Sequence, residues 1–210
     1  MSSGDRISVT TMDCFANQLQ TPEDTLETMD WDRVNPATGP IYVDGAKGGE
    51  VLKVHIERIA VGNQGIMATG ENEGVLGAHM QGLISKVVPI KNDQVIFDEK
   101  LSIPIKPMIG VIGVAPSDEE VNCGTPGSHG GNMDNTMVAA GATLYFPVYV
   151  NGALLALGDV HAVMGDGEIG VSGVEVPAEV TLRVETVRGL GLDNPVRPFQ
   201  ILCKPLCDVE

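Results

Sequence analysis

The sequence is poor in cysteine and in aromatic residues, and it contains no long hydrophobic run. Four cysteines in 210 residues lack the density of a secreted disulfide framework, so we expect reduced thiols. No run approaches the length of a membrane span, and the N-terminus lacks the apolar core of a signal peptide. We therefore expect a cytoplasmic protein without a membrane partner.

Basic residues are scarce as well. The chain has 13 lysines and arginines against 28 acidic residues, which gives a formal net charge of -15. Phosphate surfaces are bound by clustered lysine and arginine, so this balance argues against a nucleic-acid partner and against an anionic membrane.

Glycine and proline are plentiful, with 26 and 13 residues respectively. Together with only 4% aromatic residues, they predict many short extended segments joined by tight turns. We expect a mainly antiparallel all-β fold with long glycine-rich loops and little helix. Residues 1–188 would form this β domain, and residues 189–210, interrupted by Pro195, Pro198 and Pro205, would form an irregular C-terminal tail.

Period-two patterns and turn residues place the expected strands. Two apolar runs, 141–150 and 153–160, meet at Asn151 and Gly152, a strong signal for a two-residue hairpin. Residues 169–176 and 178–187 would form another hairpin. Residues 62–82 and 122–135 read as irregular glycine-rich loops. The other expected strands cover residues 6–12, 41–43, 50–59, 86–90, 94–97, 101–105 and 108–114.

The stretch 154–169 (LLALGDVHAVMGDGEI) combines apolar strand residues with four ionisable ones. Such groups must be paired, hydrogen-bonded or metal-bound when they enter a buried strand. Three pairs are spaced i,i+2, so each pair leaves an extended backbone on one face. The pairs are Asn132 with Asp134, Asp159 with His161, and Asp166 with Glu168.

Oxygen donors with one imidazole suit a divalent metal. Zinc is the first choice, and calcium or manganese fits where carboxylates dominate. A bound ion would lower the pKa of its water, and a nearby carboxylate would carry the proton to a leaving group. An alternative stays open here, in which the acidic residues cap a turn and His161 is a hydrogen-bonded core histidine.

A nucleophilic alternative is Cys123, which lies in the glycine-rich loop near His129. Its thiolate would attack a carbonyl while loop N–H groups hold the oxyanion. Cys203 and Cys207 form a lone C-x3-C pair, to which we assign no role.

Several motifs together resemble the acetamidase/formamidase family, in the family's order and over nearly the whole chain. They are residues 13–15 (DCF), 35–43 (NPATGPIYV), 108–113 (MIGVIG), 123–126 (CGTP), 129–134 (HGGNMD), 141–145 (GATLY), 158–162 (GDVHA) and 164–168 (MGDGE).

The resemblance implies a β-sandwich-like core and self-association as a homo-oligomer. It also implies a divalent metal, and hydrolysis of short-chain linear amides such as formamide or acetamide to carboxylate and ammonia. Carried over by motif, the metal ligands would be His161, Asp159, Asp134 and Asp13, and the catalytic residues would be Glu168, Asp166 and Asn132. The strand would hold Asp159 and His161 rigidly for the metal, whereas Asp166 and Glu168 would transfer protons from a glycine turn.

Two other functions remain possible at this point: an amidase with Cys123 as nucleophile, and a non-catalytic metal-binding β-domain. Family members have more chain before the first Asp-Cys and a further, partly helical region after the strand that ends near Val187. We therefore expect a short homologue or a fragment of a longer chain.

Overall fold

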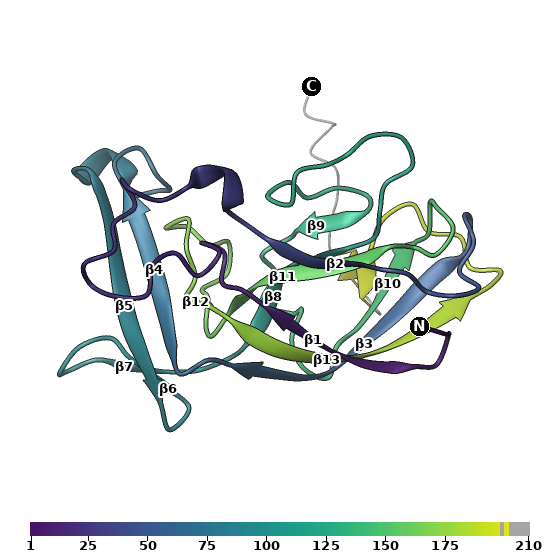
Figure 1. Cartoon of the computed structure of the whole chain (residues 1–210), viewed down its shortest axis with the longest axis horizontal. Coiled ribbons are helices and arrows are strands. Elements are labelled where there is room, and N and C mark those ends of the chain that lie inside the picture. The colour runs from purple at the N-terminus through teal and green to yellow at the C-terminus, as the bar shows by residue number, and fades with distance from the viewer. Residues whose placement is uncertain (198–199, 202–210) are drawn as a thin grey trace.

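The computed structural model describes residues 1–197 and 200–201 and consists of two antiparallel sheets (Figure 1). This confirms the all-β, sandwich-like prediction with little helix. The 3-10 turns are η1 (Trp31–Arg33) and η2 (Gly77–His79). In this part of the chain, no helix is long and apolar enough to cross a membrane.

The strands are β1 (Arg6–Thr11), β2 (Ala37–Ile41), β3 (Val51–Val61), β4 (Gln64–Gly70), β5 (Leu83–Lys91), β6 (Gln94–Ile96), β7 (Ser102–Pro104), β8 (Met108–Gly113), β9 (Gly130–Asn132), β10 (Thr143–Pro147), β11 (Leu155–His161), β12 (Glu175–Val176), β13 (Ala178–Val187), β14 (Val196–Arg197) and β15 (Gln200–Ile201).

The smaller sheet has six strands in the order β1-β13-β3-β10-β14-β15. Strand β13 lies between β1 and β3, so the first and last long strands of the chain are neighbours. Val180, Leu182 and Val184 of β13 are buried at alternate positions, as the period-two pattern requires. Their side chains belong to the main core, together with Leu52 and Phe146.

The larger sheet has nine strands and carries the polar groups described below. Its order is β7-β6-β5-β4-β12-β11-β8-β9, with β2 added beside β11. Every residue of β8 is buried, as its continuous apolar sequence predicts. Strand β11 is also buried at six of its seven positions. Its carboxyl end therefore places side chains inside the molecule.

The prediction of a hairpin at Asn151 and Gly152 is wrong. Strand β10 pairs with β3 in the smaller sheet, whereas β11 pairs with β8 in the larger one. Gly152, Ala153 and Leu154 all have left-handed backbone, with φ of 83°, 56° and 58°. The connection is therefore longer than a two-residue turn, and the chain passes from the smaller sheet to the larger one there.

The prediction of a hairpin between residues 169–176 and 178–187 is also wrong, because these two segments likewise belong to different sheets. Strand β12 pairs with β11 and β4, and β13 pairs with β1 and β3. Pro177, which has no N–H to give to a ladder, separates the two strands where the chain passes from one sheet to the other.

Two further segments differ from the sequence-based expectations. Within residues 62–82, β4 pairs with β5 at all seven of its positions, so one third of this segment is a strand and only the rest is a loop. In the expected irregular tail, Val196 of β14 pairs with Tyr145 of β10, and β14 pairs with β15. The domain boundary near residue 188 stays a prediction, and Cys203 and Cys207 lie outside the described residues.

Candidate active site

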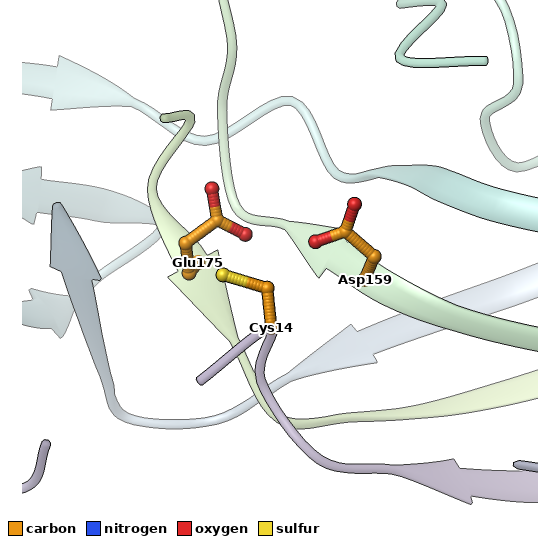
Figure 2. Close-up of side chains that lie close together, drawn as sticks. All are labelled: Cys14, Asp159 and Glu175. Atoms are coloured by element: carbon orange, nitrogen blue, oxygen red, sulfur yellow. The ribbon is translucent and has the colours of Figure 1, made fainter. Parts of the chain in front are cut away.

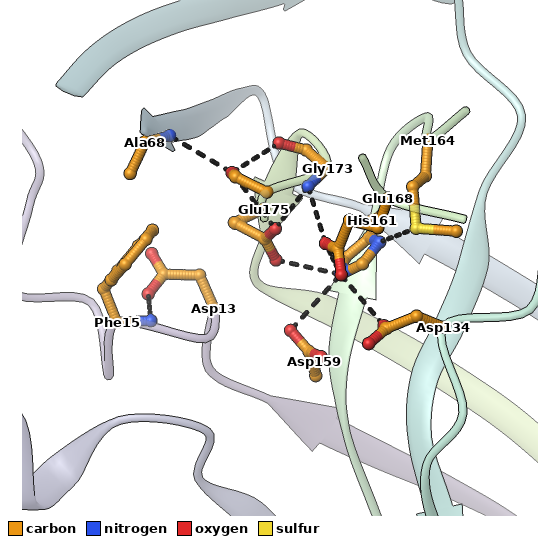
Figure 3. A network of polar contacts seen from close by, with 11 residues as sticks. Asp13, Phe15, Ala68, Asp134, Asp159, His161, Met164, Glu168, Gly173 and Glu175 are labelled. Atoms are coloured by element: carbon orange, nitrogen blue, oxygen red, sulfur yellow. Dashed lines mark hydrogen bonds and ion pairs between the residues drawn. The ribbon is translucent and has the colours of Figure 1, made fainter. Parts of the chain in front are cut away.

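One imidazole and four carboxylates meet where β11 ends (Figure 3). Asp159 and His161 belong to β11, and Glu175 belongs to its neighbour β12. Asp134 follows β9, and Glu168 lies on the loop between β11 and β12. Four separate segments of the chain thus bring their side chains to one place.

His161 is the centre of this group. Its Nε2 lies 3.1 Å from Glu175 Oε2, 3.3 Å from Asp159 Oδ1 and 3.9 Å from both Asp134 Oδ1 and Glu168 Oε1. The imidazole, Asp159 and Glu175 are buried, and Asp134 and Glu168 are about one fifth exposed, with side-chain values of 18% each. Asp134 and Glu168 therefore face outwards from the cluster.

The other contacts orient these groups. Nδ1 of His161 lies 3.2 Å from the Met164 sulfur, which leaves Nε2 for the carboxylates. The Gly173 N–H is shared between Glu168 Oε1 at 2.9 Å and Glu175 Oε1 at 2.8 Å. Contacts of this kind fix ring and carboxylate orientation around metal ligands.

Three of the residues that carry these carboxylates have a left-handed backbone conformation, which residues other than glycine rarely adopt. The φ values are 39° for Asp134, 51° for Asp159 and 42° for Glu168. Asp159 has this conformation although it lies within strand β11. Its neighbours pair with β8, Gly158 with Val111 and Val160 with Ile109. Non-glycine residues in this region cluster at functional sites, where the surrounding structure holds them.

Two glycines leave the space that the side chains occupy. A Cβ on Gly110 of β8 would lie 2.6 Å from both Asp134 Oδ1 and Asp159 Oδ2. A Cβ on Gly173 would lie 2.6 Å from His161 Nδ1. These positions require glycine because the polar groups approach the backbone so closely.

Three of the site's acids, Glu168, Glu175 and Asp134, have raised pKa values. Burial, and then the charge of Asp134, raises the pKa of Glu168 to about 8. Burial also raises the pKa of Glu175 to about 7, and burial and the Asp159 charge raise the pKa of Asp134. Burial lowers the pKa of His161, but Glu175 and Asp159 outweigh it and raise that pKa well above its usual value.

The cluster has more negative charge than its one imidazole can balance. Within residues 1–197, none of its four carboxylates pairs with a lysine or arginine. The buried oxygens Asp134 Oδ1 and Glu175 Oε2 have no hydrogen-bond partner, although Nε2 of His161 lies near both. Buried charge must be paired or metal-bound, so the residues present fit a divalent cation. Asp134, His161 and Glu168 offer ligand atoms within 4.8 Å of one another.

The structure brings four of the seven residues proposed from the sequence into this cluster: Asp134, Asp159, His161 and Glu168. The Asn132 amide lies beside Asp134 and opposes the rise in that residue's pKa. Asn132 Oδ1 is buried without a partner. Asp166 is exposed and accepts a hydrogen bond from the Thr136 hydroxyl, so it lies at the rim of the site.

Asp13 lies apart from the imidazole, although it is buried (Figure 3). Its Oδ1 accepts the N–H groups of Phe15 at 3.0 Å and Asn17 at 2.8 Å, which closes the turn after β1. Its Oδ2 lies 3.4 Å from the Gln20 amide nitrogen. Asp13 is therefore placed to hold the turn that carries Cys14.

Sequence reasoning missed Glu175 and Cys14, which lie close to Asp159 (Figure 2). Glu175 is flanked by the buried residues Val174 and Val176, so it also brings a charge into an apolar strand. That was the signal that singled out Asp159 and His161, and it was available for Glu175. Cys14 showed no such signal, because a buried cysteine is usually a small apolar residue.

Cys123 and His129 line a separate cavity of about 160 Å³, next to Gly131 and Ala156. Cys123 is half-buried, and burial lowers the pKa of His129. Two other cavities are lined by Asp134 of the cluster and by Cys14, respectively. One of about 280 Å³ is lined by Asp134 and Asp166, and one of about 210 Å³ is lined by Cys14, Phe15 and Trp31.

Two packed antiparallel sheets with buried carboxylates around one imidazole define a β protein whose side chains suit a divalent cation. The sequence matches the Acetamidase/Formamidase family over residues 1–123 and 119–201, and the chain belongs to this family.

Two solved structures and one sequence relative agree with this assignment. A predicted acetamidase/formamidase from Thermoanaerobacter tengcongensis is 65% identical with a TM-score of 0.92, over 93% of this chain and 65% of that chain. Acetamidase from Bacillus halodurans is 47% identical with a TM-score of 0.89, over 93% of this chain and 67% of that one. Formamidase from Methylophilus methylotrophus is 40% identical over 76 residues, which are 34% of this chain and 19% of that protein.

The relatives are longer than this chain. It spans about two thirds of the two solved structures, and it spans 61% of a Schizosaccharomyces pombe relative that is 24% identical over 255 residues. The family is therefore established over the described sheets, which correspond to part of the relatives' length.

Proposed function

We propose that the chain is a metal-dependent amidase that hydrolyses short-chain linear amides, such as formamide or acetamide, to carboxylate and ammonia. The observation that carries this proposal is the set of four carboxylates around His161, with two unpartnered buried oxygens and no basic partner among the described residues. Family membership supplies the reaction class.

Asp134, His161 and Glu168 would hold the cation. When bound, a divalent cation polarises a carbonyl and lowers the pKa of water, which is the chemistry that hydrolysis of an unactivated amide needs. Asp134 and Glu168 are the partly exposed members of the cluster, and Asp134 lines the cavity of about 280 Å³. A small amide would approach through this cavity.

Asn132 and Asp166 complete the proposed site. The unpartnered Asn132 Oδ1 would accept an N–H of the amide substrate, which would orient the scissile bond. Asp166 lines the same cavity as Asp134 and is hydrogen-bonded to Thr136, so it would donate the proton to the departing nitrogen. Zinc remains our first choice of metal, with calcium or manganese as alternatives.

Ammonia release from formamide and acetamide tests this function. We expect turnover with zinc, loss after chelation and recovery when metal is returned. Absence of ammonia with every divalent metal tried would contradict an amidase. In that case, metal binding without turnover would support the non-catalytic β-domain.

The Cys123 alternative is favoured by one observation, the cavity that Cys123 shares with His129. Cys123→Ala separates the two mechanisms. It would abolish turnover if the thiolate were the nucleophile, and it should leave turnover unchanged under the metal-dependent mechanism.

The homo-oligomer remains a prediction. Leu83 and Ile84 of β5 are exposed, and so are Val75 and Leu76 on the connection between β4 and β5. Exposed apolar groups that lie together on a surface commonly mark an interface. Light scattering on the purified chain tests it, and a mass of one chain would contradict it.

A further inference from the structure

Cys14, Asp159 and Glu175 form a second group of possible ligands, which shares no residue with Asp134, His161 and Glu168. Their sulfur and carboxylate oxygens lie within 4.8 Å of one another, and all three residues are buried. Figure 2 shows the Cys14 sulfur pointing toward Glu175, with Asp159 facing them from β11.

We propose that Cys14, Asp159 and Glu175 bind a second divalent cation, of the thiophilic class to which zinc belongs. The centre would then hold two ions in adjacent ligand sets. This inference rests on the cation centre of the proposed function, but it does not depend on amide hydrolysis.

The buried carboxylate of Glu175 is the independent observation that points to a ligand. Glu175 is 2% exposed, and its Oε2 lacks a hydrogen-bond partner. An unsatisfied carboxylate oxygen in the interior is costly, and a cation removes that cost directly. The oxygen lies 3.1 Å from His161 Nε2, at the boundary between the two ligand groups.

Charge balance also favours two ions over one. Four carboxylates surround the imidazole, and within residues 1–197 they pair with no other cationic side chain. One divalent ion offsets two of these charges, and a second offsets the other two, so that the Cys14 thiolate is the one remaining negative ligand. Asp159 Oδ1 lies 3.3 Å from His161 Nε2, so the second group is in direct contact with the first. Adjacent ligand sets of this kind are characteristic of two-metal hydrolytic centres.

The ligand chemistry selects the kind of ion. A thiolate is a soft ligand that suits zinc and disfavours calcium or magnesium. Three protein ligands leave a fourth tetrahedral position for water or substrate, as in catalytic zinc sites. Cys14 also lines the cavity of about 210 Å³, which gives the ion a path from the surface.

Metal analysis and cobalt spectroscopy test the site without an activity measurement. We expect two zinc ions per wild-type chain and about one per chain in Cys14→Ser. With Co²⁺ in place of zinc, wild type should show a thiolate-to-cobalt charge-transfer absorption. Cys14→Ser should lose this absorption, while Cys123→Ser and the double variant Cys203→Ser/Cys207→Ser should retain it.

X-ray absorption at the zinc edge of the wild-type chain keeps the test valid if Cys14→Ser fails to fold. It should show a sulfur neighbour at about 2.3 Å. One zinc per chain in wild type, no sulfur neighbour, or a cobalt–thiolate absorption that persists in folded Cys14→Ser would each overturn the second site. Those results leave amide hydrolysis untouched, because the ammonia assay tests it separately.

Discussion

Gly110→Ala should damage the site through a single methyl group. The new Cβ would lie 2.6 Å from Asp134 Oδ1 and 2.6 Å from Asp159 Oδ2, whereas ordinary contact begins at 3.4 Å. Each oxygen would therefore have to move by about 0.8 Å. The new Cβ would also lie 2.8 Å from the backbone oxygen of Asp159, and rotation of a side chain cannot relieve that contact.

The expected cost follows from this overpacking. Extra methyl groups in packed interiors destabilise by about 1–3 kcal/mol, and disturbed support of metal ligands weakens affinity by about 10–100-fold. We expect zinc affinity to fall within that range, measured by competition with a chromogenic chelator. Urea unfolding of the metal-free chain should show the loss of stability.

Gly165→Ala is the matched control. Gly165 lies on the loop between His161 and Glu168, it has no positive φ, and a Cβ there would meet no atom within 4 Å. Its zinc affinity and stability should equal those of wild type. Wild-type zinc affinity in Gly110→Ala would refute the placement of the two carboxylates around Gly110.

Three further predictions concern individual acids. In the metal-free chain, the raised pKa of Glu168, about 8 against 4.5 when unperturbed, makes its folded form favour the proton. As pH rises from about 5 to 8, the free energy of unfolding of wild type should therefore fall relative to that of Glu168→Gln. Urea titrations measure both, and the same pH dependence in wild type and Glu168→Gln would contradict this prediction. Asp13→Ala should lose about 1–2 kcal/mol in the same titrations, because it leaves the N–H groups of Phe15 and Asn17 unbound, and undiminished stability would show that the turn does not need its carboxylate. Asp166→Asn should bind zinc as wild type does while its kcat for formamide falls about 10²-fold or more, and a lost ion would make Asp166 a ligand.

The sequence predicted the fold class and most strands, because alternating burial in β13 and continuous burial in β8 leave direct patterns. It could not predict which strands pair. Asn151 and Gly152 carry a strong hairpin signal, but that signal is local. Whether the next strand returns to the same sheet depends on the left-handed residues Ala153 and Leu154 and on packing against distant segments.

The candidate site was predictable in part. Charges within apolar strand sequence located Asp159 and His161, and the i,i+2 spacing associated Asp134 and Glu168 with them. The same spacing also selected Asp166, which the glycine turn directs to the rim. Glu175 and Cys14 join the cluster through the pairing of β12 with β11 and through the turn after β1, and neither relation is visible in local sequence.

The pairing of β1 with β13 also bears on the order of events during synthesis. Arg6 faces Arg183, so β1 remains an unpaired strand until 177 further residues have been made. At about 5–20 residues per second, the ribosome needs roughly 10–35 s for this stretch. Cys14 follows β1, and Glu175 belongs to β12, the strand before β13. Cys14 and Glu175 are thus far apart in the sequence, and the ion-binding centre cannot be complete before β12 has been made.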